Sequence, residues 1–123
     1  MPTVRSSSTC PDLGLLQGTL DVMILKALSW RPMHGFGVAK WIRSTTDDVL
    51  QIDDGALYPA LHRMEYRGLI DADWDLTENK RRAKYYRLTA KGRQELRVRA
   101  TSWDRYASAV SKVIHATVQP SAS

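Results

Sequence analysis

The sequence of 123 residues has a single cysteine, Cys10, and no hydrophobic run long enough to cross a membrane. One cysteine excludes a disulfide within the chain and a metal cluster built on several thiolates. A membrane-spanning helix needs about 20 consecutive apolar residues, and every apolar stretch here is interrupted well before that. Residues 1–12 also lack the apolar core of a signal peptide. These absences predict a cytoplasmic protein that is not exported.

Patterns typical of catalytic and metal sites are missing as well. His34, His62 and His115 fall in three different predicted helices, without the i, i+4 spacing or nearby cysteines of a zinc site. No phosphate-binding loop and no serine–histidine–aspartate set stands out. We therefore expect no metal, no cofactor and no enzymatic activity. His34, which precedes Gly35, is expected to form a local hydrogen bond at the start of a helix.

The sequence does contain enough apolar residues for one compact domain, and it has a surplus of positive charge. Hydrophobic residues make up 43% of the chain, including four tryptophans and five tyrosines. Eighteen Lys and Arg face 13 Asp and Glu, a formal net charge of +5 that favours a polyanionic partner. We expect disordered tails at residues 1–12 and 119–123, a folded domain at 13–89 and a C-terminal helix at 90–118.

Apolar residues repeat at helical spacing in three successive segments. The first helix is expected over residues 16–28 and the second over 34–45. Asp53 and Asp54 are suited to cap a third helix, which Gly68 ends. Pro59 is placed in the first turn of this helix, where a proline is tolerated. The inward positions are expected to be Val38, Trp41, Ile42 and Thr45 in the second helix and Leu57, Ala60, Leu61 and Met64 in the third.

Two strands and one long helix complete the pattern. Residues 69–74 alternate between apolar and polar side chains, and residues 85–88 do likewise after a polar link. Thr89 is suited to cap a final helix over residues 90–117. The apolar positions of this helix step by four and three, a heptad seam that calls for a partner helix. They are Leu96, Ala100, Trp103, Ala107, Val110, Ile114 and Thr117.

This order of elements predicts a mainly α (α+β) protein, a winged helix-turn-helix with a long C-terminal dimerisation helix. In that fold the third helix enters the major groove of DNA and the hairpin lies along the backbone. Residues 78–93 hold seven basic side chains against one acidic, a net charge of +6 suited to phosphates. A charged turn that serves only solubility is the alternative. The exposed third-helix side chains expected beside it, Tyr58, His62, Arg63 and Arg67, favour DNA.

The residues also resemble a known family through five motifs in a fixed order. These are GTL at 18–20 with ILKAL at 24–28, PMHGF at 32–36, LYPALHRME at 57–65, GLI at 68–70 and YYRLTAKG at 85–92. In this combination they resemble the PadR-type transcriptional regulators. The resemblance runs from about Leu16 to Trp103, and the combination is far more specific than any single motif.

The resemblance implies a winged-helix dimer that binds operator DNA and usually represses, with two recognition helices about 34 Å apart on a roughly palindromic site. Its C-terminal helix is expected to pack against the other subunit. The expected DNA-binding residues are Gly55, Ala56, Tyr58, Pro59, His62 and Arg63 in the third helix and Lys80, Arg81, Arg82 and Lys84 in the hairpin. The expected dimer interface comprises Leu16, Leu20, Leu96, Ala100, Trp103, Ala107, Val110 and Ile114.

Two positions depart from the family's pattern. Members often have Ser, Gly and Thr before Leu-Tyr-Pro, whereas residues 53–56 here read DDGA, so a hydroxyl contact to phosphate at Ala56 is lost. The hairpin tip lacks the glycine often seen there and has Glu78, Asn79 and Lys80 instead, which leaves the turn geometry open.

Two other interpretations stay open. Trp103, in the middle of the seam, either fills the interface or lines a cavity where a flat aromatic effector stacks, as some family members bind effectors between subunits. Alternatively, the winged helix and seam form a protein-interaction module, and the basic hairpin confers only solubility. Trp30, Trp41 and Trp74 are expected to be core or hinge-packing residues.

Overall fold

The computed structural model describes residues 13–121, and within this range it describes side chains from Gly18 onward. The tail predicted at residues 1–12 therefore lies outside the described residues. Residues 119–121, part of the second predicted tail, belong to no helix or strand. None of the helices between residues 13 and 121 is apolar over enough of its length to span a bilayer.

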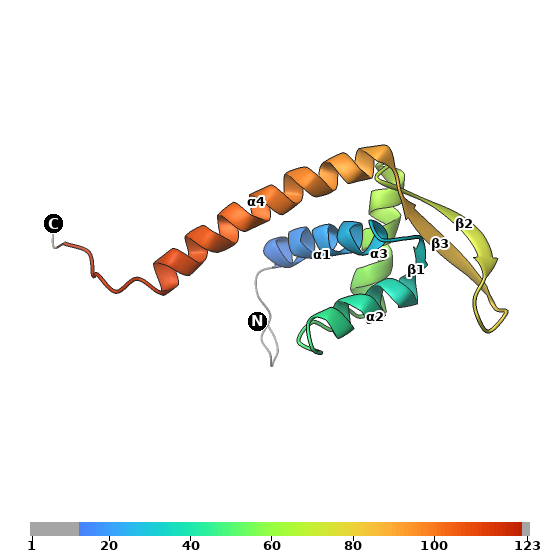
Figure 1. Cartoon of the computed structure of the whole chain (residues 1–123), viewed down its shortest axis with the longest axis horizontal. Helices are drawn as coiled ribbons and strands as arrows, with labels where there is room; N and C mark the ends of the chain where they lie inside the picture. The colour runs from blue at the N-terminus through green and yellow to red at the C-terminus, as the bar shows by residue number, and fades with distance from the viewer. Residues whose placement is uncertain (1–12, 122–123) are drawn as a thin grey trace.

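Three helices, a small antiparallel sheet and a long fourth helix make up the fold (Figure 1). The winged helix-turn-helix arrangement predicted from the sequence is confirmed. Figure 1 shows the hairpin at one end of the molecule and the C-terminal part of the fourth helix projecting beyond the opposite end. The elements are α1 (Leu13–Leu28), β1 (Met33–His34), α2 (Gly35–Thr45), α3 (Asp54–Tyr66), β2 (Ile70–Leu76), β3 (Arg82–Leu88) and α4 (Ala90–Ile114).

The core lies where α1, α2 and α3 meet the base of the hairpin. The predicted inward side chains of α3 are confirmed, since Leu57, Leu61 and Met64 have no exposed surface. They pack with Ile24 and Leu25 of α1, which are equally buried. Fully burying a side chain of this size contributes about 1.5–3 kcal/mol. This packing holds α3 with one face inward and the opposite face toward solvent.

Caps that could be predicted from the sequence mark the helix starts. His34 is the N-cap of α2, and its Nδ1 accepts a hydrogen bond from the backbone N–H of Gly37 at 3.0 Å, which confirms the expected local role. Thr89 is the N-cap of α4. Gly68 follows α3 with φ of 77°, the left-handed region that a glycine after a helix end adopts without strain.

The prediction for Pro59 is wrong by one helical turn. Asp53 caps α3 by accepting a hydrogen bond from the backbone N–H of Ala56 at 2.9 Å, so the helix begins at Asp54. Pro59 is therefore inside the helix, in its second turn. It has no N–H to donate to the carbonyl of Gly55, which costs the helix one hydrogen bond. Burial of the inward face of α3 outweighs this loss.

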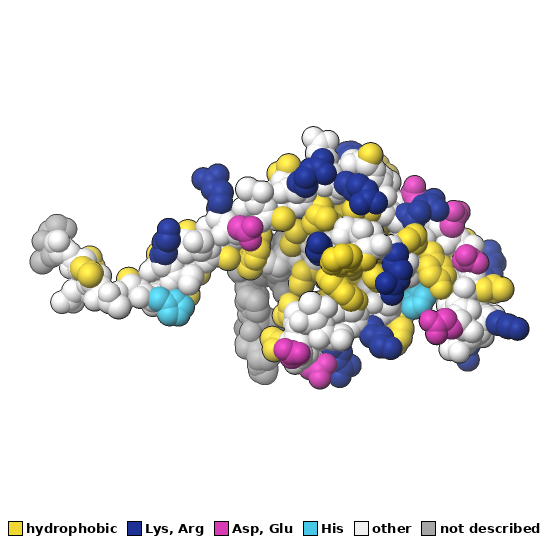
Figure 2. Space-filling model, viewed as in Figure 1, with side chains coloured by type: hydrophobic (Ala, Val, Ile, Leu, Met, Phe, Trp, Pro, Cys, Tyr) yellow, Lys and Arg dark blue, Asp and Glu magenta, His cyan; other side chains and the backbone are white. Residues whose placement is uncertain are grey.

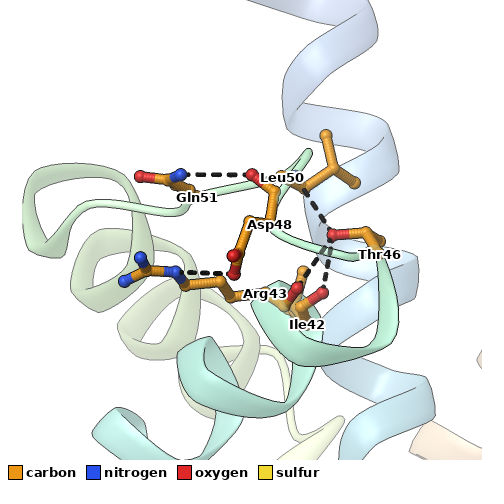
Figure 3. Close-up of polar contacts among 6 residues, drawn as sticks. All are labelled: Ile42, Arg43, Thr46, Asp48, Leu50 and Gln51. Atoms are coloured by element: carbon orange, nitrogen blue, oxygen red, sulfur yellow. Dashed lines mark hydrogen bonds and ion pairs between the residues drawn. The ribbon is translucent and has the colours of Figure 1, made fainter.

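A compact loop joins α2 to α3 and sets their relative orientation (Figure 3). The Thr46 hydroxyl donates to the carbonyl of Ile42 at 2.9 Å and accepts from the N–H of Leu50 at 3.0 Å. Arg43 Nε binds Asp48 Oδ1 at 3.1 Å, and Asp48 adopts the left-handed φ of 67° that Asp tolerates better than most residues. The loop is thus tied to the end of α2 at two points.

The sheet contains a strand that the sequence did not reveal. The two-residue β1 pairs with β3, giving the order β1-β3-β2 with all neighbours antiparallel. A strand of two residues is too short for an alternation pattern. The hairpin strands are also longer than predicted, because β2 continues to Leu76 and β3 already begins at Arg82. The final helix ends three residues earlier than predicted, at Ile114.

Two of the three tryptophans expected in the core or at hinges lie mainly in solvent. Trp30 is 61% exposed, with the Lys26 ammonium 4.6 Å from its ring centroid. Trp74 is 58% exposed, because the hairpin extends past the helices that cover its base (Figure 1). Trp41 is half-buried and packs against the core, as predicted. Thr45, expected on the inward face of α2, is exposed.

Gly92 gives a sharp test of how α4 is seated. A Cβ built at Gly92 would overlap the carbonyl oxygen of Leu69 and approach Leu88 Cδ1 to 2.8 Å. Because the nearest atom belongs to the backbone, it cannot move aside as a side chain would. We expect Gly92→Ala to destabilise the protein by about 1–3 kcal/mol, as overpacked cores do. The midpoint of urea unfolding measures this change.

Gly18→Ala is the matched control, because it makes the same substitution inside a helix with open space around the new methyl group. The alanine should stabilise α1 by about 0.5–1 kcal/mol. Equal unfolding midpoints for the two variants would contradict the close seating of α4 on Leu69.

Candidate nucleic-acid interface

The exposed face of α3 carries two tyrosines and a histidine. Tyr58 is 44% exposed and its ring lies against Gly35 at the start of α2. Pro59 and His62 are exposed on the same face. Tyr66, 89% exposed, continues this face one turn after His62 and was missed in the sequence analysis. The i, i+4 spacing from His62 was the signal that could have found it.

The N-terminal end of α3 is also open to solvent. Gly55 and Ala56, both predicted to bind DNA, are exposed in the first turn. The Asp53 carboxylate is occupied as the cap, which fits its expected structural role. Asp54 is exposed in the first turn, where its negative charge interacts favourably with the helix dipole. The same charge repels a phosphate.

Arg63, expected on the exposed face of α3, turns toward α1 instead. Its Nη2 donates to Oδ1 of Asp21 at 2.7 Å. The bond joins residues 42 positions apart in the sequence. Local periodicity places Arg63 at the edge of the exposed face but says nothing about a carboxylate on another helix. The guanidinium is therefore engaged within the protein.

The hairpin tip closes through an ordered turn that needs no glycine. The backbone N–H of Lys80 donates to the carbonyl of Thr77 at 2.8 Å, and the N–H of Arg81 donates to the Thr77 hydroxyl at 3.2 Å. Lys80 takes the left-handed φ of 60° that a glycine usually supplies. The side chains of Lys80 and Arg81 are both exposed. The tip thus presents two cations in a defined turn.

The two other predicted hairpin cations contact protein groups. The Arg82 guanidinium lies 4.9 Å from the ring centroid of Trp74 and remains exposed. Lys84 Nζ lies 3.0 Å from Glu65 Oε1 on α3, and this hydrogen bond raises the pKa of Lys84 above its ordinary value. Its ammonium also lies 5.5 Å from the ring centroid of Tyr86. Lys84 thus ties the hairpin to α3.

Two basic residues nearer the base of the hairpin contact protein groups. Arg87 forms ion pairs with Asp71 at 2.9 Å and Asp73 at 3.3 Å, across the two strands. Lys91 Nζ donates to the carbonyl of Arg67 at 2.9 Å. Figure 2 shows acidic side chains among the basic ones at the hairpin end of the molecule. Part of the net charge of +6 counted from the sequence is therefore balanced by Asp71 and Asp73, which pair with Arg87.

An open groove separates the hairpin from the start of α2. It has a volume of about 1230 Å³, and its walls include Phe36, Lys40, Tyr58, Arg81 and Arg82. Phe36 is 68% exposed. The groove thus joins the N-terminal part of α3 to the basic tip, combining aromatic and cationic side chains on one surface.

The predicted α4 seam is open along its C-terminal part. Trp103 is 42% exposed, Val110 38% and Ile114 70%. Ala100 and Ala107 are half-buried. These apolar groups lie along α4, and the C-terminal part of this helix extends past the body of the protein (Figure 1). Such a surface favours a partner helix.

Three other residues predicted in the dimer interface show no exposed apolar side chain among those described. Leu20 is only 5% exposed within the chain's own core, so it has almost no surface left for a partner. Leu96 is half-buried against the same core. The side chain of Leu16 lies outside the described residues. The apolar surface available to a partner therefore begins near Ala100.

Trp103 lines a shallow cleft between α1 and α4. The cleft has a volume of about 280 Å³, and Gly18, Val22, Arg99 and Tyr106 also line it. The rings of Trp103 and Tyr106 are 6.2 Å apart between centroids. The cleft lies beside the seam, so a second subunit packed on α4 would cover it.

Among the described side chains, no group of three or more His, Cys, Asp or Glu is suited to hold a metal.

Comparisons with known proteins identify a family and several similar proteins. Residues 24–98 match the family model described as the transcriptional regulator PadR-like family. A solved transcriptional regulator from Clostridium thermocellum is 29% identical, with a TM-score of 0.73, covering 80% of this chain and 96% of that one. A solved PadR family transcriptional regulator from Eggerthella lenta is 32% identical, with a TM-score of 0.68, covering 85% and 89%. An uncharacterised protein from Lysinibacillus sphaericus is 27% identical, covering 72% of this chain and 82% of that protein.

Proposed function

The chain belongs to the PadR-like family of transcriptional regulators, and from this premise we propose that it is a cytoplasmic repressor that binds a palindromic promoter site as a homodimer. The family consists of DNA-binding regulators of transcription and not of enzymes, so the expectation of no catalysis is confirmed. Bound at a promoter, the dimer would block RNA polymerase. The proposal divides the chain into a DNA-binding domain at 13–89 and a dimerisation helix at 90–118.

One observation carries the proposal: Tyr58 on the open face of α3 borders the same groove as Arg81 and Arg82 of the hairpin. Tyr58, Pro59, His62 and Tyr66 are exposed on α3, where side chains can reach base edges in the major groove. Gly55 and Ala56, at the start of that helix, allow close approach of a phosphate to the backbone. Lys80, Arg81 and Arg82 supply charge for the phosphate backbone. Arg63 and Lys84, held by carboxylates of the protein, support the surface and are not proposed as contacts.

The α4 seam supports the dimer. We propose that Ala100, Trp103, Ala107, Val110 and Ile114 pack against their counterparts in a second copy of the chain. A two-fold symmetric pair of α3 helices then matches two half-sites about one helical turn of DNA apart. We also propose a second function for this surface, the binding of an effector in the cleft beside Trp103. The aromatic lining of the cleft favours a flat apolar molecule.

A salt titration of DNA binding tests the proposal. The affinity for the DNA upstream of the protein's own gene is compared with that for a scrambled duplex, and the oligomeric state is measured in parallel. We expect a dimer that prefers its own upstream DNA by at least about a thousandfold. Equal and weak binding to both duplexes would point instead to a protein-interaction module with a basic surface.

A further inference from the structure

Asp21 is the only charged side chain that is buried among those described, with 6% of its surface exposed. Both carboxylate oxygens accept hydrogen bonds, each from an arginine on a different helix. Oδ1 accepts from Arg63 Nη2 of α3 at 2.7 Å, and Oδ2 accepts from Arg99 Nη1 of α4 at 3.4 Å. Arg99 is held from its other side by Glu95 Oε2, 2.6 Å from its Nε. One carboxylate of α1 thus joins the recognition helix to the seam helix.

This link matters because α3 and α4 each pack on α1 more than on each other. Their direct connection is at one end, where the Lys91 ammonium binds the carbonyl of Arg67 and α4 is seated on Leu69. Beyond that end, α4 is held by its packing on α1, where Leu96 contacts the core. Arg99 lies seven residues beyond Gly92, about 10 Å along α4 at 1.5 Å per residue. The bond from Arg99 to Asp21 adds a directional polar contact to this packing, and together with the contact at Gly92 it defines the direction of the helix.

We propose that Asp21 is a positioning residue that fixes the direction of α4 relative to α3, and through it the separation of the two recognition helices in the dimer. The inference rests on the proposed function, in which α4 joins two subunits. A swing of about 10° at the start of α4 moves the end of a helix about 37 Å long by about 6 Å. That displacement approaches two base-pair steps of about 3.4 Å each. The angle between α4 and α3 therefore determines which spacing of DNA half-sites the dimer can bind.

The same geometry gives Arg63 a role different from DNA contact. Its guanidinium holds the α3 end of the link, so its removal changes where α3 points and leaves the number of phosphate contacts unchanged. A lost phosphate contact would instead make the slope of log K against log salt shallower by about 0.9. The salt slope thus separates positioning from contact.

The first experiment measures tolerance to spacing. Binding is compared on operators with the natural spacing and with one base pair added or removed between the half-sites. We expect the normal protein to lose at least about tenfold in affinity on the altered operators, in line with the cost of a mismatched position. Asp21→Asn keeps the shape of the side chain and removes its charge, and it should lose less than about threefold, with an unchanged salt slope. Full spacing discrimination in Asp21→Asn would overturn the inference.

Two further variants make this comparison specific. Glu95→Gln removes the negative charge of the other partner of Arg99 and leaves the link through Asp21 intact, so it should discriminate spacing as the normal protein does. Arg99→Gln cuts the link on the α4 side, and it should relax discrimination as Asp21→Asn does. The double variant of Asp21 and Arg99 should relax it no further, because either change alone already breaks the link between α3 and α4. A purely stabilising role would lower the melting temperature of these variants without changing spacing preference.

The second experiment requires neither DNA nor a dimer. Spin labels are attached at Tyr66→Cys on α3 and Arg105→Cys on α4, both exposed positions, in a chain that also carries Cys10→Ser. Dilution with unlabelled protein leaves only distances within one chain. We expect the distance distribution to become at least twofold wider in Asp21→Asn or Arg99→Gln. An unchanged width in both variants would overturn the inference, whereas a wider distribution in a protein without operator preference would contradict only the proposed function.

Discussion

Replacing both Lys80 and Arg81 by alanine is expected to weaken binding to operator and scrambled DNA alike, by about 100-fold at moderate salt. Each charge-assisted contact to a phosphate is worth about 1.5 kcal/mol or more, and 1.4 kcal/mol is a factor of ten. Neither side chain reads a base in the proposed complex, so the preference for the operator should persist. The slope of log K against log salt should become shallower by about 1.8, at about 0.9 for each contact.

Arg87→Ala is the matched control on the same hairpin. It also removes one positive charge, but that charge already pairs with Asp71 and Asp73. We expect a salt slope within error of the normal protein. If Arg87→Ala changed the slope as much as a tip substitution, general charge and not the tip would account for binding.

Val110→Asp is expected to give the second large effect by separating the dimer. Val110 occupies the proposed seam and is 38% exposed in the single chain. Two symmetry-related carboxylates would be buried side by side, and an unpaired buried charge costs about 3–5 kcal/mol. The dissociation constant of the dimer should therefore rise by at least about a thousandfold. Sedimentation measures this change, and operator affinity should fall with it because each monomer reaches one half-site.

Val98→Asp makes the same substitution on the opposite side of α4. Val98 is 58% exposed and stands off the heptad seam, so the variant introduces the same charge and a similar helix propensity. We expect it to remain a dimer with normal operator binding. A monomeric Val98→Asp, or a dimeric Val110→Asp, would show that the seam is not the interface.

Interactions between residues close in sequence could be predicted with the greatest certainty. Asp53, Thr89 and His34 cap helices whose first N–H groups lie three residues away, so the capping pattern is written in adjacent positions. The inward face of α3 follows from helical spacing alone, which placed Leu57 and Met64 correctly. The family motifs are of the same kind, because they combine such local signals in a fixed order.

Interactions between distant segments could not be predicted in this way. The Lys84 ammonium belongs to a basic run in the sequence, yet it binds Glu65, 19 residues away. Trp74 has a large aromatic side chain of the kind expected in a core, but it is exposed because the hairpin extends beyond the helices that could cover it. In both cases a neighbouring element determines the role of the side chain, and its position depends on how the whole chain packs.

The sequence by itself therefore determined the helices, their caps, the hairpin and the family, because each depends on spacing within a few residues or on an ordered set of such spacings. Only the tertiary structure decided which cations are free to meet DNA and which hold the protein together. Arg63 and Arg99 reach the same carboxylate of Asp21 from 42 and 78 residues away. No periodicity in a chain encodes a contact at such separation, since it arises only when three helices pack around one buried charge.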